Sequence, residues 1–232
     1  MRSIPPIVKN LLIINVLVFI ASELVLPRQG IMLDDTCGLH FFLAKEFYPH
    51  QFITYMFLHG SVTHLLLNMF ALWMFGGIVE RTLGTKRFII YYLVCGIGAG
   101  ICQEIAQYIH YSNLDIFNVP QGTEMIQCIN LEGYDMPVSL SSYLAHWNCV
   151  GASGCIYGIL LAFGICFPEE RLFIFPIPVP IKAKYFVLIY AVIEVMSVVT
   201  RAHDGVAHIA HLGGMAIGWI LIRWWRDRGT LF

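Results

Sequence analysis

Three short stretches of this sequence combine the residue types that chemistry at a carbonyl carbon requires. The first is Gly151-Ala152-Ser153-Gly154, in which a hydroxyl nucleophile stands among small residues at the start of an apolar run. Small neighbours let another backbone approach closely, and the free N–H groups of a helix's first turn can receive negative charge. Both features suit a serine that generates an oxyanion. Such clusters, here with Gly154 and Gly158 four residues apart, are also typical of packing between membrane helices.

The second stretch holds two hydrogen-bonding side chains on one helix face. His64 and Asn68 are four residues apart within an apolar run, so both project from the same side of a helix. Two donors on a buried face can stabilise negative charge that develops on a carbonyl oxygen. The alternative is that they only hydrogen-bond neighbouring helices and so hold a bundle together.

The third stretch supplies a candidate general base. His211 lies early in the last apolar run, and Gly214 and Gly218 follow it on one stripe of the helix. These glycines allow close packing, which brings a neutral imidazole within reach of side chains on a neighbouring helix. His208, three residues earlier, makes a metal-binding histidine pair the alternative. The sequence lacks the HExxH motif of zinc peptidases, so we expect no metal.

The composition decides what kind of element positions these residues. Hydrophobic residues make up 58% of the 232 residues and charged residues only 12%, about half the usual share of a soluble domain. A soluble globule of this length cannot bury so much apolar surface, and a net charge of −1 provides no field that attracts nucleic acid. The composition therefore excludes a soluble enzyme, a disordered chain and a basic nucleic-acid-binding protein. It favours a lipid bilayer as the solvent.

Six apolar segments approach the length of about 20 residues that predicts a membrane-spanning helix. The chain is therefore predicted to be an all-α, polytopic membrane protein with one domain over residues 1–232. The first segment lacks a clear cleavage site, so we interpret it as a retained helix rather than a signal peptide. The predicted spans are residues 8–26, 52–79, 88–110, 149–168, 183–200 and 205–225.

The basic residues sort to one side of these spans. With the N-terminus in the cytoplasm, most of the 14 Lys and Arg residues face the cytoplasm, as the positive-inside rule requires. Both termini are then cytoplasmic, and residues 111–148 form a long outer loop whose role the sequence leaves open. Cys37 and Cys128 lie in outer loops, and the sequence does not decide whether they form a disulfide. Only Arg28, Lys45 and Arg201 among the basic residues fall on the outer side.

This topology places three polar groups at the same depth. Spans two, four and six all enter the membrane from outside, so His64, Ser153 and His211 lie in one layer near the outer face. Polar residues at such positions usually face the interior of a bundle or a wet cavity. No Asp or Glu accompanies them in those three spans, so we expect a Ser–His dyad rather than a triad with an acid.

In the order and spacing of these motifs the chain resembles the rhomboid family of intramembrane serine proteases, which implies a six-helix membrane bundle. The resemblance covers about residues 50–225 and includes Glu80-x-x-x-Gly84 and the stretch Pro178–Lys184. Three features depart from the family pattern. The common Glu-x-Arg-x-Gly run has its arginine displaced by one position, to Arg81. The first outer loop has Phe47–Phe52 where the family often carries a Trp-Arg pair. The outer loop at 111–148 is longer than in compact bacterial members.

The resemblance implies a role for each motif residue. Ser153 would be the nucleophile and His211 the base, while His64 and Asn68 would line the oxyanion hole with the Ser153 backbone N–H. Tyr157, one turn after Ser153, would pack on the catalytic imidazole. Gly151 would help to stabilise the oxyanion or the substrate, Gly154 would support the site, and the face with Gly214 and Gly218 would pack span six on span four.

The resemblance also implies cleavage of the transmembrane segments of other membrane proteins near the outer face of a bacterial plasma membrane, without a cofactor. His59 would be structural, bonding within the first outer loop. Two alternatives remain. A catalytically inactive relative would bind membrane clients without cutting them. A haem or metal protein would use His59, His64, His208 and His211 as ligands and would not need Ser153.

Overall fold

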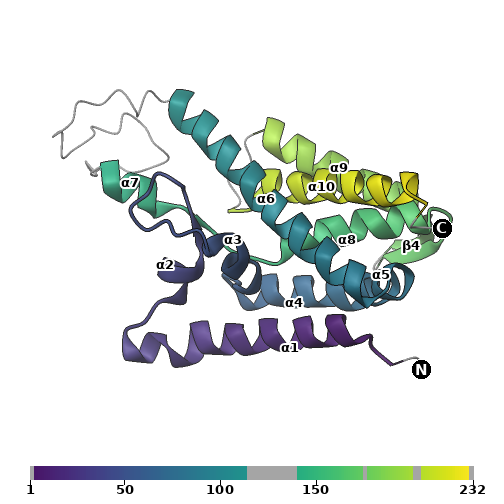
Figure 1. The fold of residues 1–232 in the computed structure, drawn as a ribbon, viewed down its shortest axis with the longest axis horizontal. Helices are drawn as coiled ribbons and strands as arrows, with labels where there is room; N and C mark the ends of the chain where they lie inside the picture. Colours follow the sequence, from purple (N-terminus) through teal and green to yellow (C-terminus); the bar gives the residue numbers. More distant parts are fainter. Residues whose placement is uncertain (1–2, 114–139, 175–176, 201–204, 230–232) are drawn as a thin grey trace.

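Helices lie in all six apolar segments in the computed structural model of the chain, which describes residues 3–113, 140–174, 177–200 and 205–229 (Figure 1). The predicted, mostly helical fold is confirmed. The long helices are α1 (Pro6–Ile20), α4 (Val62–Ala71), α5 (Gly77–Leu83), α6 (Thr85–Asn113), α8 (Ser153–Cys166), α9 (Ala183–Val199) and α10 (His208–Asp227). Tighter or wider turns extend α1 and α4 at η1 (Ala21–Val25), η2 (Pro27–Gln29) and η4 (Leu72–Gly76), and η3 (Tyr55–Phe57) follows the short helix α3 (Gln51–Thr54).

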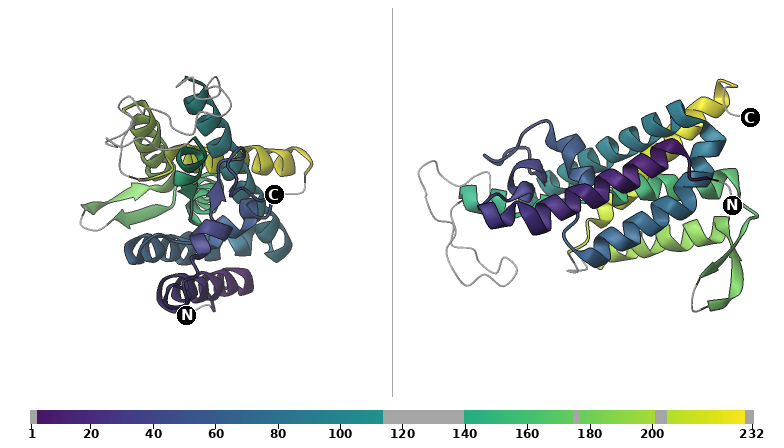
Figure 2. Two further views of the ribbon diagram at one scale, coloured as in Figure 1. Left: turned by 90° about the vertical axis from the view of Figure 1, so that its left-hand side faces the viewer. Right: turned by 90° about the horizontal axis from the view of Figure 1, so that it is seen from below.

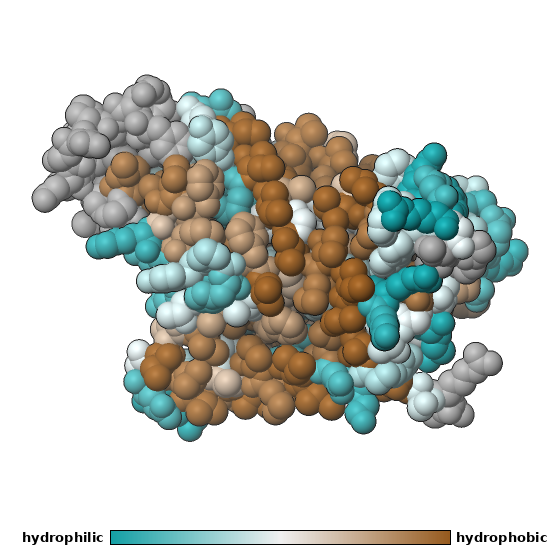
Figure 3. Space-filling model, in the orientation of Figure 1, coloured by the Kyte–Doolittle hydropathy of each residue, from teal (hydrophilic) through white to brown (hydrophobic). Residues whose placement is uncertain are grey.

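Three continuous helical stretches are long and apolar enough to cross a bilayer: Pro6–Gln29, Val62–Leu83 and Thr85–Asn113. Helix α8 is apolar but shorter. The protein is therefore an integral membrane protein, and six crossings stay a prediction. Figure 3 shows a broad hydrophobic band across the middle of the molecule with hydrophilic residues gathered toward its ends, as a bilayer requires.

The two ends of the bundle differ in what they carry. Both chain termini lie at the same end, beside the hairpin of β3 (Arg171–Ile174) and β4 (Ile177–Lys182) (Figures 1 and 2). The opposite end carries α2 (Leu33–Cys37), α3 (Gln51–Thr54) and α7 (Leu140–His146). Termini at one end agree with an even number of crossings.

Most of the predicted outer loop, and Cys128 with it, lies at positions 114–139, outside the described residues. Cys37 forms no disulfide within the part of the chain that the structure describes. The pairing of these two cysteines therefore stays undecided.

Span two begins later than predicted. Residues 52–57 belong to the short helices α3 and η3, and the long helix starts only at Val62. The Ser61 side chain sets this start, because its Oγ accepts a hydrogen bond of 3.1 Å from the backbone N–H of His64. Hydropathy alone did not separate the two helices, since the residues on both sides of the break are apolar.

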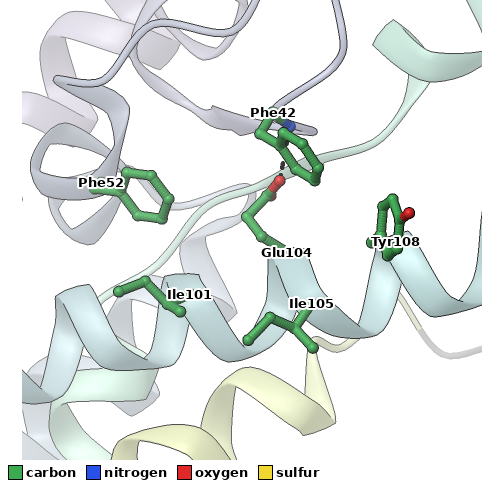
Figure 4. A pocket seen from close by; sticks show the side chains of 6 residues that line it. All are labelled: Phe42, Phe52, Ile101, Glu104, Ile105 and Tyr108. Atoms are coloured by element: carbon green, nitrogen blue, oxygen red, sulfur yellow. Dashed lines mark hydrogen bonds between the residues drawn. The ribbon is translucent and has the colours of Figure 1, made fainter.

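Side-chain hydrogen bonds, rather than a Trp-Arg pair, anchor the segment between α1 and α4. Gln51 is buried: its Nε2 donates to the Glu46 carbonyl (2.8 Å), and its Oε1 accepts from the His40 N–H (3.2 Å). In the same segment, the Phe42 N–H donates to Glu104 Oε2 of α6 (2.7 Å). Figure 4 shows this contact at the edge of an apolar pocket lined by Phe42, Phe52, Ile101, Glu104, Ile105 and Tyr108.

The same segment is paired with the residues that lead into α8. Strand β1 (Leu39–His40) is antiparallel to β2 (Asn148–Cys149), with Leu39 opposite Cys149. Nearby, the Gly151 N–H donates to the Tyr55 carbonyl at 2.9 Å. These backbone bonds fix the chain just before Ser153.

Helix α1 is held by a carboxylate from α5. Glu80 is buried, and its two oxygens accept hydrogen bonds from the backbone N–H groups of Ile7 (3.1 Å) and Val8 (2.8 Å). These N–H groups belong to the first turn of α1, where no backbone acceptor is available. The first residue of the predicted Glu80-x-x-x-Gly84 motif thus caps a helix about 70 positions earlier in the chain.

Candidate active site

The predicted nucleophile and base meet at the junction of α8 and α10. Ser153 is the first residue of α8, and His211 lies in the first turn of α10. The Oγ of Ser153 and the Nε2 of His211 are 2.8 Å apart, which is a hydrogen-bond distance. The imidazole is buried, with 7% of the His211 surface exposed. The structure therefore brings together two side chains that are 58 positions apart in the sequence.

Contact between the backbones of two helices produces this distance. A Cβ atom added at Gly214 would overlap the carbonyl oxygen of Gly154, so α10 and α8 pack with no side chain between them at this point. Gly218 faces a different neighbour: a Cβ there would meet the side chains of Tyr91 and Cys95 on α6. The predicted glycine stripe of α10 is thus divided between α8 and α6, because α10 packs against both.

Tyr157 lies flat on the imidazole of His211. The two rings are nearly parallel, with an interplanar angle of 8° and 4.2 Å between centroids. Tyr157 is one helical turn after Ser153, so the same helix supplies the hydroxyl and the surface against which the imidazole rests. The Tyr157 hydroxyl donates a hydrogen bond to Oε1 of Glu194.

Glu194 of α9 is a member of this site that the sequence motifs do not include. Its Oε1 lies 3.0 Å from Nδ1 of His211, and its Oε2 lies 2.5 Å from Nδ1 of His208. The residue is buried, with 3% of its surface exposed. A signal was present in the sequence, since Glu194 is the only acidic residue between 183 and 200. A lone carboxylate in an apolar span is usually functional.

Helix α4 closes the other side of Ser153. A Cβ atom at Gly151 would lie 2.8 Å from the His64 imidazole and 3.6 Å from the Ser153 Oγ. The φ angle of Gly151 is +135°, a conformation that residues with a side chain rarely adopt. Glycine at this position therefore permits both the backbone turn and the close approach of His64 to the serine.

The other two polar residues of this segment have different surroundings. Asn68 is buried on α4, one turn after His64, and makes no side-chain hydrogen bond to another described residue. His59 is also buried, and its ring meets the His64 ring edge-on at 5.1 Å. His59 therefore packs against the site, and no ring hydrogen bond to the outer loop is present among the described residues.

One group of side chains has the composition of a metal site. Among the described residues, Glu194, His208 and His211 offer ligand atoms that all lie within 4.8 Å of one another. Two donors that share a tetrahedral zinc ion at 2.0–2.1 Å would be about 3.3 Å apart. The two N–O distances here, 2.5 and 3.0 Å, are both shorter, and the 2.5 Å contact between His208 and Glu194 is a hydrogen bond. His59 and His64 are not members of this group.

The arrangement has the parts of a nucleophilic hydrolysis site. A serine hydroxyl contacts one ring nitrogen of an imidazole, and the other nitrogen of that ring faces a carboxylate. Free N–H groups at the start of α8 and the His64 side chain lie on the other side of the hydroxyl.

Two comparisons with known proteins point to one family. A family model described as the Rhomboid domain matches residues 46–226. The chain is similar to the rhomboid protease AarA of Providencia stuartii, with 28% identity over 166 residues. That alignment covers 70% of this chain and 51% of the relative, so the chain spans about half the length of that protein.

Proposed function

The chain belongs to the rhomboid family, and we propose that it is an intramembrane serine endopeptidase that uses Ser153 and His211. The observation that carries this proposal is the 2.8 Å distance between Ser153 Oγ and His211 Nε2. Two such groups on different helices, held together by direct backbone packing, match the geometry that nucleophilic catalysis by serine requires.

The proposed reaction is hydrolysis of a peptide bond in two steps. Ser153 Oγ attacks the carbonyl carbon while His211 Nε2 takes the hydroxyl proton, and the same nitrogen returns that proton to the leaving amine. Water then attacks the acyl-enzyme ester with His211 again as base, releasing the carboxylic acid. The Ser153 backbone N–H, His64 and Asn68 stabilise the oxyanion in both steps, and Gly151 leaves room for it.

The proposed substrates are transmembrane segments of single-pass or polytopic membrane proteins. A helix shields its carbonyl groups, so the segment unwinds near the bond that is cut. The narrow space at Ser153, where Gly151 lies against the His64 imidazole, favours small side chains beside that bond. The reaction needs no cofactor. We place the protein in the plasma membrane of a bacterium, with six crossings, both termini in the cytoplasm and the site near the outer face.

The test is a cleavage assay with purified protein in detergent and a fluorescently labelled transmembrane substrate. Wild-type protein should cut the substrate, while Ser153→Ala and His211→Ala should reduce the rate to the level of buffer. His208→Ala should retain more activity than His211→Ala, because only His211 contacts the serine. Cleavage by Ser153→Ala would overturn the mechanism. Binding of the substrate by a wild-type protein that never cuts it would support an inactive, client-binding relative instead.

A further inference from the structure

We propose that Glu194 is a positioning residue that orients His211 and stabilises its imidazolium, so that the site works as a Ser153–His211–Glu194 triad. This inference rests on the proposed function. The sequence predicts a Ser–His dyad without an acid, and this proposal adds a carboxylate to that dyad. That expectation considered the acidic residues of spans two, four and six only, whereas this carboxylate comes from span five.

The surroundings of Glu194 suit a charged carboxylate. The side chain lies inside the bundle, and a carboxylate is costly there unless neighbouring groups compensate for its lost hydration. Two neighbouring helices supply polar partners: α8 contributes the Tyr157 hydroxyl, and α10 contributes His208 and His211. Both carboxylate oxygens therefore have a partner. One of the three partners is the proposed base itself.

The two nitrogens of His211 have separate surroundings that define its tautomer. Nε2 must carry no proton if it is to accept the hydroxyl proton of Ser153, so the ring proton has to lie on Nδ1. Oε1 of Glu194 lies 3.0 Å from Nδ1. Nδ1 has no well-directed hydrogen-bond partner among the described residues, so its interaction with Glu194 is mainly one of charge. That attraction strengthens when the imidazole becomes positive during the attack.

Tyr157 and His208 fix the position of the Glu194 carboxylate relative to the His211 imidazole. Tyr157 stacks on the His211 ring and also donates its hydroxyl to Oε1 of Glu194. His208 bonds the other oxygen, Oε2, at 2.5 Å. The sequence pattern His208-x-x-His211 thus places two imidazoles around one carboxylate, and only the second of them reaches the serine.

The experiment compares kcat, KM and pH–rate profiles of Glu194→Gln and Glu194→Asp with wild type, using Ser197→Ala on the same helix as a matched control. Glu194→Gln keeps the size of the side chain and removes its charge. We expect kcat to fall at least ~100-fold, less than the ~10⁴-fold cost of neutralising the acid of a Ser-His-Asp triad, with KM nearly unchanged. Ser197→Ala should keep wild-type kinetics.

The pH profile separates positioning from a merely structural role. Among the residues that the structure describes, the titratable groups that face His211 are Glu194 from α9, Tyr157 from α8, His64 from α4 and His208 from its own helix. Without the neighbouring negative charge, the His211 imidazolium forms only at a higher proton concentration. The acid limb of kcat/KM should therefore move to lower pH in Glu194→Gln and stay near its wild-type position in Glu194→Asp, even if Glu194→Asp is slower. A packing defect would lower the rate equally at every pH.

Three results would overturn the inference. The first is a folded Glu194→Gln protein with wild-type kcat and an unmoved acid limb. The second is a Glu194→Asp protein in which the acid limb of kcat/KM has shifted from its wild-type position. This result decides the question if Glu194→Gln does not fold. The third is a stoichiometric metal ion in purified wild type that is lost from either variant. Failure of the proposed function gives a different pattern, because wild type would then be inactive or Ser153→Ala would cut.

Discussion

At the residue scale, the imidazole of His211 is fixed along three directions. Ser153 contacts Nε2, Glu194 lies near Nδ1, and Tyr157 covers one face of the ring. The proposed base therefore has little freedom to rotate before a substrate arrives. An imidazole that is already oriented need not be ordered during the reaction, which lowers the barrier to attack.

Tyr157 contributes a stacked ring and a hydroxyl hydrogen bond to the site, and two substitutions can separate these contributions. Tyr157→Phe keeps the stacked ring and removes the hydrogen bond to Glu194, so we expect kcat to fall about 10-fold, in line with one bond to a charged group. Tyr157→Leu removes the parallel ring as well and should lower kcat further. Steady-state kinetics on the labelled substrate measure both effects. Equal rates for Tyr157→Phe and wild type would show that the hydroxyl has no part in catalysis.

Gly151 should tolerate no side chain. Gly151→Ala places a Cβ atom 2.8 Å from the His64 imidazole and imposes a φ angle of +135° on alanine. Strain of this kind costs about 1–3 kcal/mol, so we expect kcat to fall about 10- to 100-fold. Gly60→Ala is the matched control, because its Cβ would meet only Val150 at 3.9 Å. Cleavage of the substrate at the same rate by both variants would contradict this requirement for glycine.

The sequence was informative about residues that sit in recurring motifs and uninformative about a residue that stands alone. Ser153, Tyr157 and His211 are identifiable because their spacing to neighbouring glycines is distinctive. Glu194 has no such spacing, and only the packing of α9 against α8 and α10 reveals its partners. Gly218 differs from Glu194, because its motif is evident in the sequence but its packing against α6 is not.

At the element scale, the site depends on how closely α10 approaches α8. The spans could be predicted from hydropathy because a lipid environment leaves few choices other than an apolar helix. The break before Val62, the β1–β2 pairing and the Gln51 contacts could not be predicted, because they depend on individual hydrogen bonds between distant residues.

Gly214 tests the role of helix contact in catalysis. A methyl group in Gly214→Ala would overlap the Gly154 carbonyl, which is backbone and cannot rotate away, so α10 must move off α8. A displacement of about 1 Å between Ser153 and His211 should reduce kcat about 100-fold. The measurement is kcat alongside thermal unfolding in detergent, with Gly60→Ala as control. A variant that stays folded and fully active would show that the contact does not set the catalytic distance.

Glu80 should stabilise the fold without affecting the chemistry. In Glu80→Gln an uncharged amide replaces the carboxylate that caps the first turn of α1, which should cost about 1–2 kcal/mol. For a chain of this length that loss corresponds to a decrease in Tm of about 2–8 °C, measured by tryptophan fluorescence during heating. Glu23→Gln, which neutralises an exposed carboxylate, should leave the Tm unchanged. Equal Tm values for the two variants would contradict the capping role.

At the scale of the whole molecule, orientation in the membrane is the main prediction that remains. Both termini and the β3–β4 hairpin lie at one end of the bundle, and α2, α3 and α7 lie at the other. We expect reporter fusions at either terminus to be cytoplasmic and an insertion at positions 114–139 to be exposed outside. Fluorescent and phosphatase reporters give opposite signals on the two sides. Termini on opposite sides would contradict six crossings.

The hydrogen bonds between Glu80 and α1 also determine when α1 can reach its final position during synthesis of the chain. Helix α1 leaves the ribosome before α5, because its capping carboxylate is synthesised more than 70 residues later. During that interval the helix is in the membrane without its final contacts, and the N–H groups of Ile7 and Val8 must be satisfied by water or lipid head groups. Docking of the first helix is thus timed by insertion of the second span, which couples biogenesis to the assembly of the bundle.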